Sequence, residues 1–399
     1  MEDLTRRRFL NFSGAALCTL AIPALAGLPG EVHAAEDDIR GNVFRGDGPR
    51  TLWPWSREAM DYRSLDAGRV VCGLCPHRCN LAPGDRGICR ARVNFQGRLF
   101  SLSYGNPCAV NLDPVEKKPL FHFLPATRAF SIAAAGCNLR CLNCQNWEIS
   151  QARPEDVRHR ELFPHQVVAT AAAAGARSIA YTYSEPITFY EYMHDTAQQA
   201  RAAGICNLLI SAGYINPEPL RRLCAVLDGA NLNLKSFSDA VYRRLNGARL
   251  EPILETFEIL HAAGVHLEIT HLVVPGYTDD ERMVDQMCHW ILDRLGPDHP
   301  LHFSRFYPKY KLDRLAPTPV ETLARFRRLA LDLGLRYVYV GNVPGHEGNH
   351  TYCHHCGSLI IERRGYLPAR NEMAAGCCRF CGTRIPGVWP DGQAAGPPV

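Results

Sequence analysis

Three cysteines on one short stretch, Cys137, Cys141 and Cys144, are the residues best suited to chemistry. They follow an apolar run, 130–135, through a single glycine, and their C-x3-C-x2-C spacing lets three thiols on one loop face a common metal centre. No fourth cysteine follows at ferredoxin spacing, so a 4Fe–4S cluster held here keeps one iron free of protein sulfur. Such an iron can bind a substrate or cofactor as well as carry electrons. The alternative is that the three thiols are structural, paired or zinc-bound.

The composition is that of a globular metalloprotein. The chain has 399 residues, of which 46% are hydrophobic and 21% charged, enough for one large domain with appendages or for two ordinary domains. The net charge is only +4, and the arginines are scattered without interleaved aromatics, so nucleic-acid binding is not indicated. Most of the seventeen cysteines fall into short-spaced groups, whereas disulfide frameworks spread cysteines over loops. We therefore expect metal sites.

A second cysteine group precedes the first in the chain and comprises Cys72, Cys75, Cys79 and Cys89. Turn-forming prolines and glycines lie between these cysteines, so the four thiols can wrap one tetrahedral ion or a small cluster, with His77 as a substitute ligand. Zinc and an auxiliary iron–sulfur cluster both suit four thiolates, and ligand softness alone does not separate them. Reduced thiols without a metal are the third interpretation.

A third cysteine group forms two C-x2-C-G units, Cys353/Cys356 and Cys378/Cys381, about twenty residues apart. This pattern predicts a zinc ribbon, in which each unit supplies two thiolates to one tetrahedral Zn²⁺. A rubredoxin-like iron site has the same geometry and stays open as an alternative. Cys377 is then a spare cysteine.

Between these groups, strand and helix patterns alternate. Seven apolar runs predict strands at 130–135, 178–183, 205–210, 232–235, 265–274, 301–306 and 336–340. Longer amphipathic or alanine-rich segments predict helices at 164–174, 187–203, 217–227, 238–246, 252–263, 279–295 and 320–333. Six or seven βα repeats predict a parallel sheet covered by helices, which we interpret as a partial (β/α)6 TIM-like barrel over residues 126–342. Cysteine-rich segments flank it at 66–125 and 343–390.

Polar residues follow several of these predicted strands, where the loops of a barrel converge. They are Glu185, Ser211, Gly213, Lys235 and Arg305. An acid, a glycine turn, a lysine and an arginine facing a cluster would suit a zwitterionic, adenosine-bearing cofactor. The glutamate can accept from an ammonium, and the lysine can pair with a carboxylate. A dense charged patch at 111–120, by contrast, is the pattern of a solvated turn.

Taken together, these motifs resemble a known group of enzymes. The C-x3-C-x2-C loop after a first barrel strand is similar to the signature of radical S-adenosylmethionine (SAM) enzymes, and Ser184-Glu185-Pro186 resembles their Gly-Gly-Glu-Pro element. Leu234-Lys235 and residues 274–279 resemble the pyruvate formate-lyase activating enzyme branch. The broader match, to the AmmeMemoRadiSam-system radical enzymes, covers most of 70–390. It is carried by residues 72–79, 113–125, 137–147, 181–186 and 302–306.

The resemblance implies a 4Fe–4S cluster on Cys137, Cys141 and Cys144, with Glu185 binding the methionyl amino group of SAM. Reductive cleavage of SAM then yields a 5′-deoxyadenosyl radical that abstracts hydrogen from a substrate, either a protein, as activating enzymes do, or a small molecule. The residue before the third cluster cysteine is usually aromatic and is Asn143 here, so Leu142 or Trp147 would cover the adenine instead.

The resemblance also implies partners: an electron donor such as flavodoxin or ferredoxin, and the proteins of the AmmeMemoRadiSam system. A non-catalytic iron–sulfur or zinc protein for electron transfer or metal handling is the competing hypothesis.

The N-terminal 34 residues read as a targeting segment. Residues 5–10, Thr-Arg-Arg-Arg-Phe-Leu, form a twin-arginine signature, an apolar run follows, and residues 32–34 offer a cleavage site. The apolar run is too short for a comfortable membrane span. We predict a signal peptide at 1–34, a linker at 35–65, a disordered tail at 391–399, and export to the periplasm or cell envelope. Function in the cytoplasm is the alternative, because the reaction needs a strong cytosolic reductant.

Overall fold

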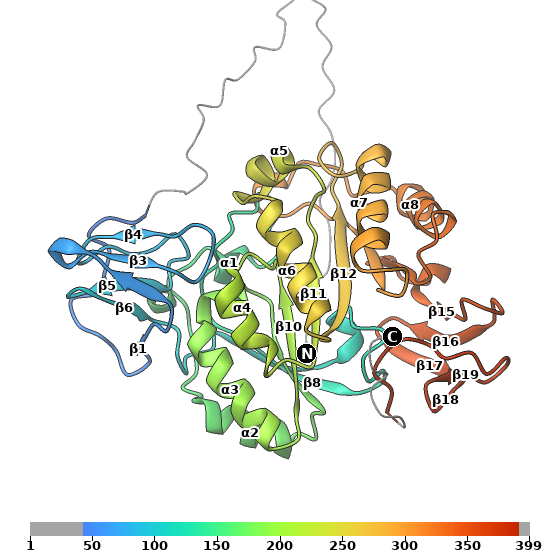
Figure 1. Cartoon of the computed structure of the whole chain (residues 1–399), viewed down its shortest axis with the longest axis horizontal. Helices are drawn as coiled ribbons and strands as arrows, with labels where there is room; N and C mark the ends of the chain where they lie inside the picture. The colour runs from blue at the N-terminus through green and yellow to red at the C-terminus, as the bar shows by residue number, and fades with distance from the viewer. Residues whose placement is uncertain (1–42, 391–399) are drawn as a thin grey trace, which may run out of the picture. The chain divides into compact units, whose positions relative to one another are not determined.

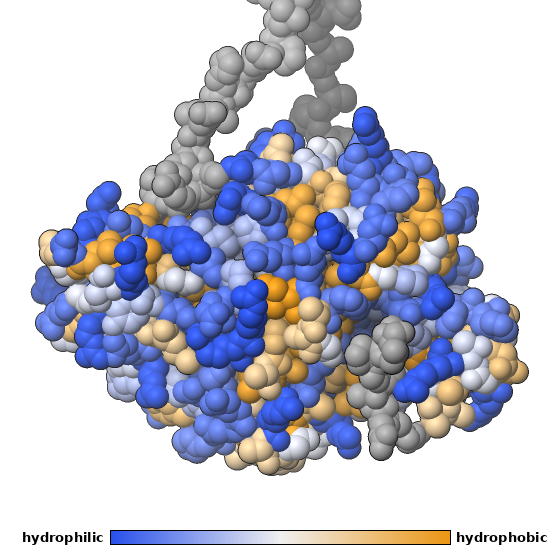
Figure 2. Space-filling view, viewed as in Figure 1, coloured by the Kyte–Doolittle hydropathy of each residue, from blue (hydrophilic) through white to orange (hydrophobic). Residues whose placement is uncertain are grey.

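The computed structural model of the protein describes residues 43–390. The predicted signal peptide, the beginning of the predicted linker and the predicted tail lie outside this range. No helix within the described residues is long and apolar enough to cross a membrane. On the face shown in Figure 2, hydrophilic residues predominate and hydrophobic ones form small patches.

The centre of the fold is one eight-stranded sheet with the strand order β14-β13-β12-β11-β10-β9-β8-β7. Its strands are β7 (Ala109–Pro114), β8 (Arg128–Ala133), β9 (Ser178–Tyr181), β10 (Cys206–Ser211), β11 (Gly229–Asn233), β12 (His266–Val273), β13 (Leu301–Arg305) and β14 (Val338–Gly341). The seven strands from β8 to β14 are parallel, while β7 pairs antiparallel with β8. Within residues 43–390, β7 and β14 are not bonded to each other, so the ladder is open.

Helices connect the parallel strands, as the alternating pattern predicts. They are α2 (Pro164–Ala173), α3 (Tyr190–Ala202), α4 (Pro217–Cys224), α6 (Glu251–Ala262), α7 (Glu281–Arg294) and α8 (Val320–Asp332). Because each strand lies beside its predecessor and such crossovers are right-handed, the helices gather on one face of the sheet. Figure 1 shows α3, α4 and α6 lying over the strands. Apolar strand residues such as Phe130, Ile179 and Leu209 share one buried cluster with the helices. The predicted α/β fold is confirmed.

The opposite face of the sheet is covered by the segment after β7. Val115 and Leu120 pack there against Ala129 and Leu208, which alternate with the helix-facing residues along their strands. Our prediction of a solvated turn at 111–120 is wrong, since Glu116 and Lys118 are only 1% and 2% exposed. Lys118 Nζ pairs with the carboxylate of Asp113 at 2.7 Å, and Glu116 accepts from the Ala126 N–H at 2.7 Å. These charges are tolerated in the interior because each has a partner.

The N-terminal segment adds two small antiparallel sheets. One has the order β1 (Arg57–Glu58), β6 (Arg98–Ser101), β5 (Arg92–Phe95), and the other has the order β2 (Tyr62–Ser64), β3 (Val70–Cys72), β4 (Asn80–Leu81). Val70, Leu81 and Leu99 join the main hydrophobic core. Arg92 donates to both carboxylate oxygens of Glu191 on α3, at 3.0 and 2.6 Å. This segment is therefore part of the same packed body as the central sheet.

The C-terminal segment carries β15 (Thr351–Tyr352), β16 (Leu359–Arg364) and β17 (Leu367–Asn371), followed by the pair β18 (Met373–Ala374) and β19 (Cys377–Cys378). It has its own small core, in which Ile360, Ile361 and Ile385 pack with Phe121 and Tyr339. Phe121 belongs to the segment that covers the open face of the sheet, and Tyr339 lies on β14. The C-terminal segment thus extends the cover of that face.

Candidate active site and metal centres

The three-cysteine loop follows β8 and is held by a π-helical turn, η5 (Tyr242–Asn246). The backbone N–H groups of Arg140 and Leu142 donate to the carbonyls of Asn246 and Leu245, at 2.8 and 2.9 Å. Gly247 ends the turn at φ +68°, and a Cβ there would lie 3.4 Å from the Arg140 side chain. Wide helical turns of this kind expose carbonyls that a regular helix would consume, and here those carbonyls fix the shape of the loop.

Hydrogen-bond donors approach two of the three sulfur atoms. The Asn246 side-chain Nδ2 lies 3.2 Å from Cys141 Sγ, and the Leu139 N–H lies 3.3 Å from Cys137 Sγ. Burial raises the pKa of Cys137 well above its ordinary value, and the negative charges of Glu185 and the two neighbouring cysteines add to the shift. A Cys137 thiolate therefore needs a positive centre to be stable, which is the condition that a bound iron cluster satisfies.

Glu185 lies directly after β9, at the start of the short helix η4 (Pro186–Phe189), and is 3% exposed. Its carboxylate accepts three hydrogen bonds, from Ser211 Oγ at 2.6 Å, the Ala212 N–H at 2.9 Å and the Ile187 N–H at 3.2 Å. Burial raises the pKa of Glu185, while these donors and the charge of Lys235 oppose the rise. The site is a buried acceptor held in place by two strand ends.

Lys235 follows β11, and its positive charge acts on both sides of the site. It lowers the pKa of Glu185, and it opposes the burial that raises the pKa of Cys144. The Lys235 backbone N–H donates to the hydroxyl of Tyr242 at 2.9 Å, and Tyr242 is the first residue of the turn η5 that holds the cysteine loop. The structure therefore brings together the cysteine loop, Glu185 and Lys235, which the sequence placed at three strand ends.

The other predicted cofactor residues have different surroundings. Ser211 donates to Glu185 and accepts from the Gly213 N–H at 2.9 Å, so both residues position the carboxylate. Arg305 Nε donates to the Thr318 carbonyl at 2.8 Å, within the connection after β13. Trp147 stacks on Tyr310, with ring centroids 5.1 Å apart and an angle of 14° between the planes. One face of the Trp147 ring is therefore already covered by protein.

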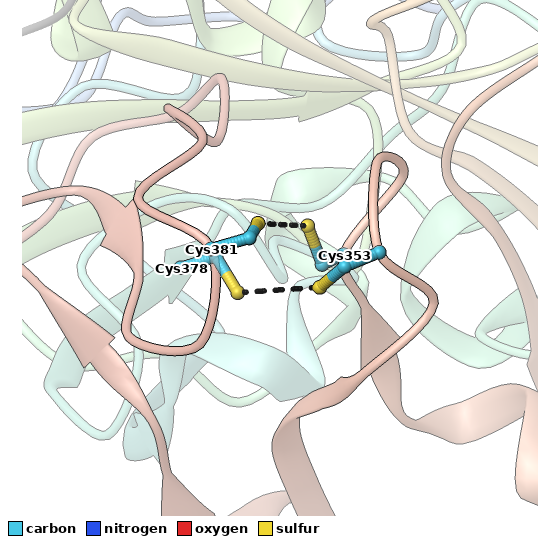
Figure 3. Close-up of side chains that lie close together, drawn as sticks. Cys353, Cys378 and Cys381 are labelled. Atoms are coloured by element: carbon cyan, nitrogen blue, oxygen red, sulfur yellow. Dashed lines mark hydrogen bonds between the residues drawn. The ribbon is translucent and has the colours of Figure 1, made fainter.

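The C-terminal cysteines form the most compact sulfur cluster of the described residues. The ligand atoms of Cys353, Cys356, Cys378 and Cys381 all lie within 4.8 Å of one another. Figure 3 shows two loops facing each other, with sulfur pairs joined at 3.6 Å for Cys353–Cys381 and 3.8 Å for Cys356–Cys378. Metal–sulfur bonds of about 2.3 Å in a tetrahedron put sulfur atoms about 3.8 Å apart. The set has the size of a single-ion site.

The two C-x2-C-G units also have the same backbone. The N–H groups of Cys353 and Cys378 each donate to the carbonyl of the residue five positions later, at 2.9 and 2.8 Å. Gly357 and Gly382 have φ values of +70° and +76°. Each glycine permits the left-handed turn that aims both thiols of its unit at one point. His354 is engaged elsewhere, with Nδ1 2.7 Å from the Tyr337 hydroxyl. The segment is therefore suited to bind an extra metal ion through four thiolates.

The N-terminal cysteines are arranged differently. Cys72, Cys75, Cys79 and Cys89 line one cavity, whose wall also includes Asn138 from the three-cysteine loop. They do not form a set with sulfur atoms all within 4.8 Å, and among the described residues only the C-terminal cysteines do. All sixteen cysteines between residues 43 and 390 are free thiols. The predicted preference for metal sites over disulfides therefore fits this part of the chain.

Two residues of the site were missed by sequence reasoning. Asn246 donates to Cys141 from a segment more than one hundred residues away in the chain. Asn138 lies inside the cysteine loop, donates to the Tyr214 carbonyl at 2.8 Å and contacts His77 Nε2 through its own carbonyl at 2.7 Å. Asn138 could have been suspected from its place between two ligands, but nothing in the pattern around Asn246 marks it.

The chain is similar to several known proteins. The model of the radical SAM superfamily matches residues 131–287. An uncharacterized protein of Methanocaldococcus jannaschii is 45% identical over 331 residues, which covers 82% of this chain and 98% of that protein. The pyruvate formate-lyase 1-activating enzyme of Escherichia coli is 25% identical over 221 residues, covering 51% of this chain and 89% of that enzyme. SuiB of Streptococcus suis, solved with SAM, is 11% identical and covers 57% of this chain and 53% of its own, with a TM-score of 0.44.

The fold and site are those of an iron–sulfur enzyme built on a parallel α/β sheet. The chain belongs to the radical SAM superfamily and is similar to its activating enzymes. Membership implies a 4Fe–4S cluster, SAM and an external reductant. The residues fit these groups, because three thiols on one loop, two of them with hydrogen-bond donors, lie at the same edge of the sheet as the buried Glu185 carboxylate and Lys235.

Proposed function

We propose that Cys137, Cys141 and Cys144 hold the 4Fe–4S cluster and that Glu185 and Lys235 bind the methionyl end of SAM. When bound, the cluster supplies the electron that cleaves SAM to methionine and the 5′-deoxyadenosyl radical. The observation that carries this assignment is geometric. Glu185 is buried and its carboxylate is held by Ser211 and the Ala212 N–H, while the Lys235 N–H donates to Tyr242 of the turn that holds the cysteine loop.

The surrounding residues prepare this site. Glu185 is buried, so its carboxylate, when ionised, binds an ammonium more strongly than an exposed carboxylate would. Ser211 and the Ala212 N–H hold two oxygens of that carboxylate and leave it one orientation. Ser184 Oγ donates to the Ala134 carbonyl at 2.6 Å, which fixes the Glu185 segment against the strand that leads into the cysteine loop. Fixed geometry of this kind reduces the entropy cost of bringing cofactor and cluster together.

We infer that the hydrogen donor is a segment of another protein. The similarity to an enzyme named for activating pyruvate formate-lyase supports this class of substrate, with a glycyl hydrogen as the candidate. Residues 113–125 and 302–306 support membership of the AmmeMemoRadiSam system, whose other proteins are candidate partners. A one-electron donor such as flavodoxin or ferredoxin would supply the reductant.

We further propose Zn²⁺ for the C-terminal cysteines and export by the twin-arginine route. Four thiolates at tetrahedral spacing are the commonest structural zinc ligands. Zinc rather than iron in purified chain would support the first proposal. N-terminal sequencing of chain recovered from the cell envelope, beginning near residue 35, would support the second. Recovery of the full-length chain from the cytoplasm alone would contradict export.

The test of the radical function is SAM cleavage. Anaerobically reconstituted chain, reduced with dithionite, should convert SAM to 5′-deoxyadenosine and methionine, as measured by chromatography. Cys141→Ala should abolish the product, and Glu185→Gln should reduce its rate by about 10- to 100-fold with unchanged iron content, since one charge-assisted hydrogen bond is lost. Cys224→Ala, a half-buried cysteine outside the three groups, is the matched control. Full cleavage by Cys141→Ala would remove the loop from the mechanism, and a complete cluster without cleavage would favour an electron carrier.

A further inference from the structure

The four N-terminal cysteines, here called the cage, surround a cavity next to the radical site. Cys72 ends β3, Cys75 and Cys79 lie on the turn before β4, and Cys89 lies in the loop before β5. All four thiols line the same cavity. Gly87 faces this cavity too, and a Cβ there would lie 3.8 Å from Cys79 Sγ and 3.9 Å from Cys89 Sγ. The cage is therefore a space bounded by sulfur on several sides.

The cage differs from the C-terminal group, whose four sulfur atoms all lie within 4.8 Å of one another. Among the described residues, only that C-terminal group has its ligand atoms gathered as around a single ion. A tetrahedral ion requires sulfur atoms about 3.8 Å apart. In an iron–sulfur cluster the thiolates are distributed over several irons, so the protein sulfur atoms stand farther apart around a filled centre. The three-cysteine loop, which belongs to a family that binds such a cluster, is likewise not gathered around a single ion in the way of the C-terminal cysteines.

A buried cation without a complete set of partners faces the cage. Arg92 is 2% exposed and lines the cavity. Two of its nitrogens donate to Glu191, but Nε has no hydrogen-bond partner among the described residues. A buried N–H without a partner is costly. Glu191 already balances the charge of Arg92, but the unpaired Nε–H can donate to an anionic, thiolate-bound centre in the cavity that Arg92 lines.

The cage also touches the loop of the radical site. A Cβ on Gly136, the residue before Cys137, would lie 2.5 Å from the Cys89 carbonyl oxygen, so only glycine fits there. His77 Nε2 lies 2.7 Å from the Asn138 carbonyl. Thr188, on the short helix that Glu185 begins, lines the cavity of the cage. The segments that carry the two cysteine groups are therefore in direct contact.

We propose that Cys72, Cys75, Cys79 and Cys89 bind a second iron–sulfur cluster that exchanges electrons with the cluster on the three-cysteine loop. One electron leaves the reduced cage cluster and enters the neighbouring cluster, and a one-electron donor of low potential then reduces the cage again. The electron-transfer part rests on the proposed radical function, while the occupancy of the cage does not.

The occupancy is tested in a chain that cannot form the radical cluster. The triple variant Cys137→Ala/Cys141→Ala/Cys144→Ala is reconstituted anaerobically with iron and sulfide, and its iron, acid-labile sulfide and zinc are counted. We expect iron and sulfide in equal amounts, with an electron paramagnetic resonance signal after reduction by dithionite. Adding Cys75→Ala and Cys79→Ala to this variant should remove both the iron and the sulfide. Zinc without sulfide at the cage, or a cage free of metal, would overturn the proposal.

Contact between the clusters is tested by their spectra. Two paramagnetic clusters held by segments in contact broaden each other's signals. The spectrum of the fully reduced wild-type chain should therefore differ from the sum of two spectra, that of the triple variant and that of a Cys75→Ala/Cys79→Ala variant. A spectrum equal to that sum would overturn the electron-transfer part. If the wild-type chain fails to cleave SAM while the triple variant retains iron and sulfide, the proposed radical function is wrong and the proposed cage cluster is supported. Cys224→Ala controls for nonspecific effects of replacing a cysteine. If the Cys75→Ala/Cys79→Ala variant fails to fold, the metal content of the triple variant alone tests the occupancy of the cage.

Discussion

The chain contains two groups of four cysteines that differ in geometry although their number of thiols is the same. The C-terminal group closes to sulfur distances of 3.6 and 3.8 Å at two turns of matching backbone. The cage keeps its four thiols around a cavity and shares its wall with the radical loop. Ligand number alone therefore does not decide what is bound. The arrangement of the thiols and the residues around them must also be considered.

The two groups also differ in what lies next to them. Cys356 and Cys381 are exposed, and hydrogen bonds with Ser358 lower the pKa of Cys356 to about 6. Burial instead raises the pKa of Cys72 to about 11 and that of Cys75 to about 12. A structural ion at the surface and a redox centre shielded from water are the functions that these environments suit.

The largest expected effect is on thiol reactivity. In metal-free chain at pH 7, Cys356 and Cys381 should react with iodoacetamide at least about 100-fold faster than Cys72 and Cys75, because only the exposed pair offers accessible thiolate. Mass spectrometry of the alkylated peptides measures the order in which the cysteines react. Lowering the pH below 6 should slow the alkylation of Cys356, since protonation removes its thiolate. Equal alkylation rates in both groups would contradict this difference between the two groups.

Removal of the C-terminal metal should have the next largest effect. A chelator that strips zinc should leave the cage iron in place and reduce amide protection over residues 351–385 by on the order of 10³-fold, because the small core of that segment depends on the metal. Hydrogen exchange with mass spectrometry measures this loss. Protection that persists in metal-free chain would show that packing around Ile360 and Ile361 suffices.

Asn138→Ala should disturb the cage and the radical loop together. The substitution removes the donor to the Tyr214 carbonyl and a buried side chain between the two cysteine groups, at a cost of about 1–3 kcal/mol in unfolding free energy. Chemical denaturation measures this cost, and paramagnetic resonance should show changes at both clusters while the C-terminal metal is retained. Asn207→Ala is the control, because Asn207 is equally buried but bonds to Ala197 and Val226, away from the cysteines. The same spectral change in both variants would make the Asn138 effect nonspecific.

The smallest expected effect is at Asn246. Replacing it with alanine removes the donor to Cys141 Sγ, which stabilises the more negative, reduced cluster, so the midpoint potential should fall by roughly 30–60 mV. A redox titration of the chain that lacks the cage cluster isolates this signal. The cage potential should not change in the complementary triple-alanine background. A potential that stays constant at the radical site would mean that Nδ2 does not bond to the ligated sulfur.

Much of the fold was predictable from local patterns. Seven predicted strands correspond to β8 through β14, and predicted helices such as 164–174 and 320–333 match α2 and α8 within one residue at each end. Apolar runs bounded by turns report burial directly, and alternating strands and helices leave few topologies. The strand ends then placed Glu185 and Lys235 beside the cysteine loop, since parallel strands put their carboxyl ends at one edge.

Other features depended on contacts between distant segments. Glu116 and Lys118 are buried because their segment packs over one face of the sheet. The pattern of charges in the sequence does not reveal that Lys118 will be buried as an ion pair with Asp113. The link between Asn246 and Cys141 needs a π-helical turn that local sequence did not predict.

The sequence by itself determined the chemistry of this protein, because the types and spacing of Cys137, Cys141 and Cys144 and the following glutamate are local properties. It left open what Cys72, Cys75, Cys79 and Cys89 bind, because thiol number and spacing suit both an ion and a cluster. Only the tertiary structure separated the two four-cysteine groups. The cage packs against Gly136 and Asn138 with its four thiols around a cavity, while two matching glycine turns bring the C-terminal sulfur atoms within 4.8 Å of one another.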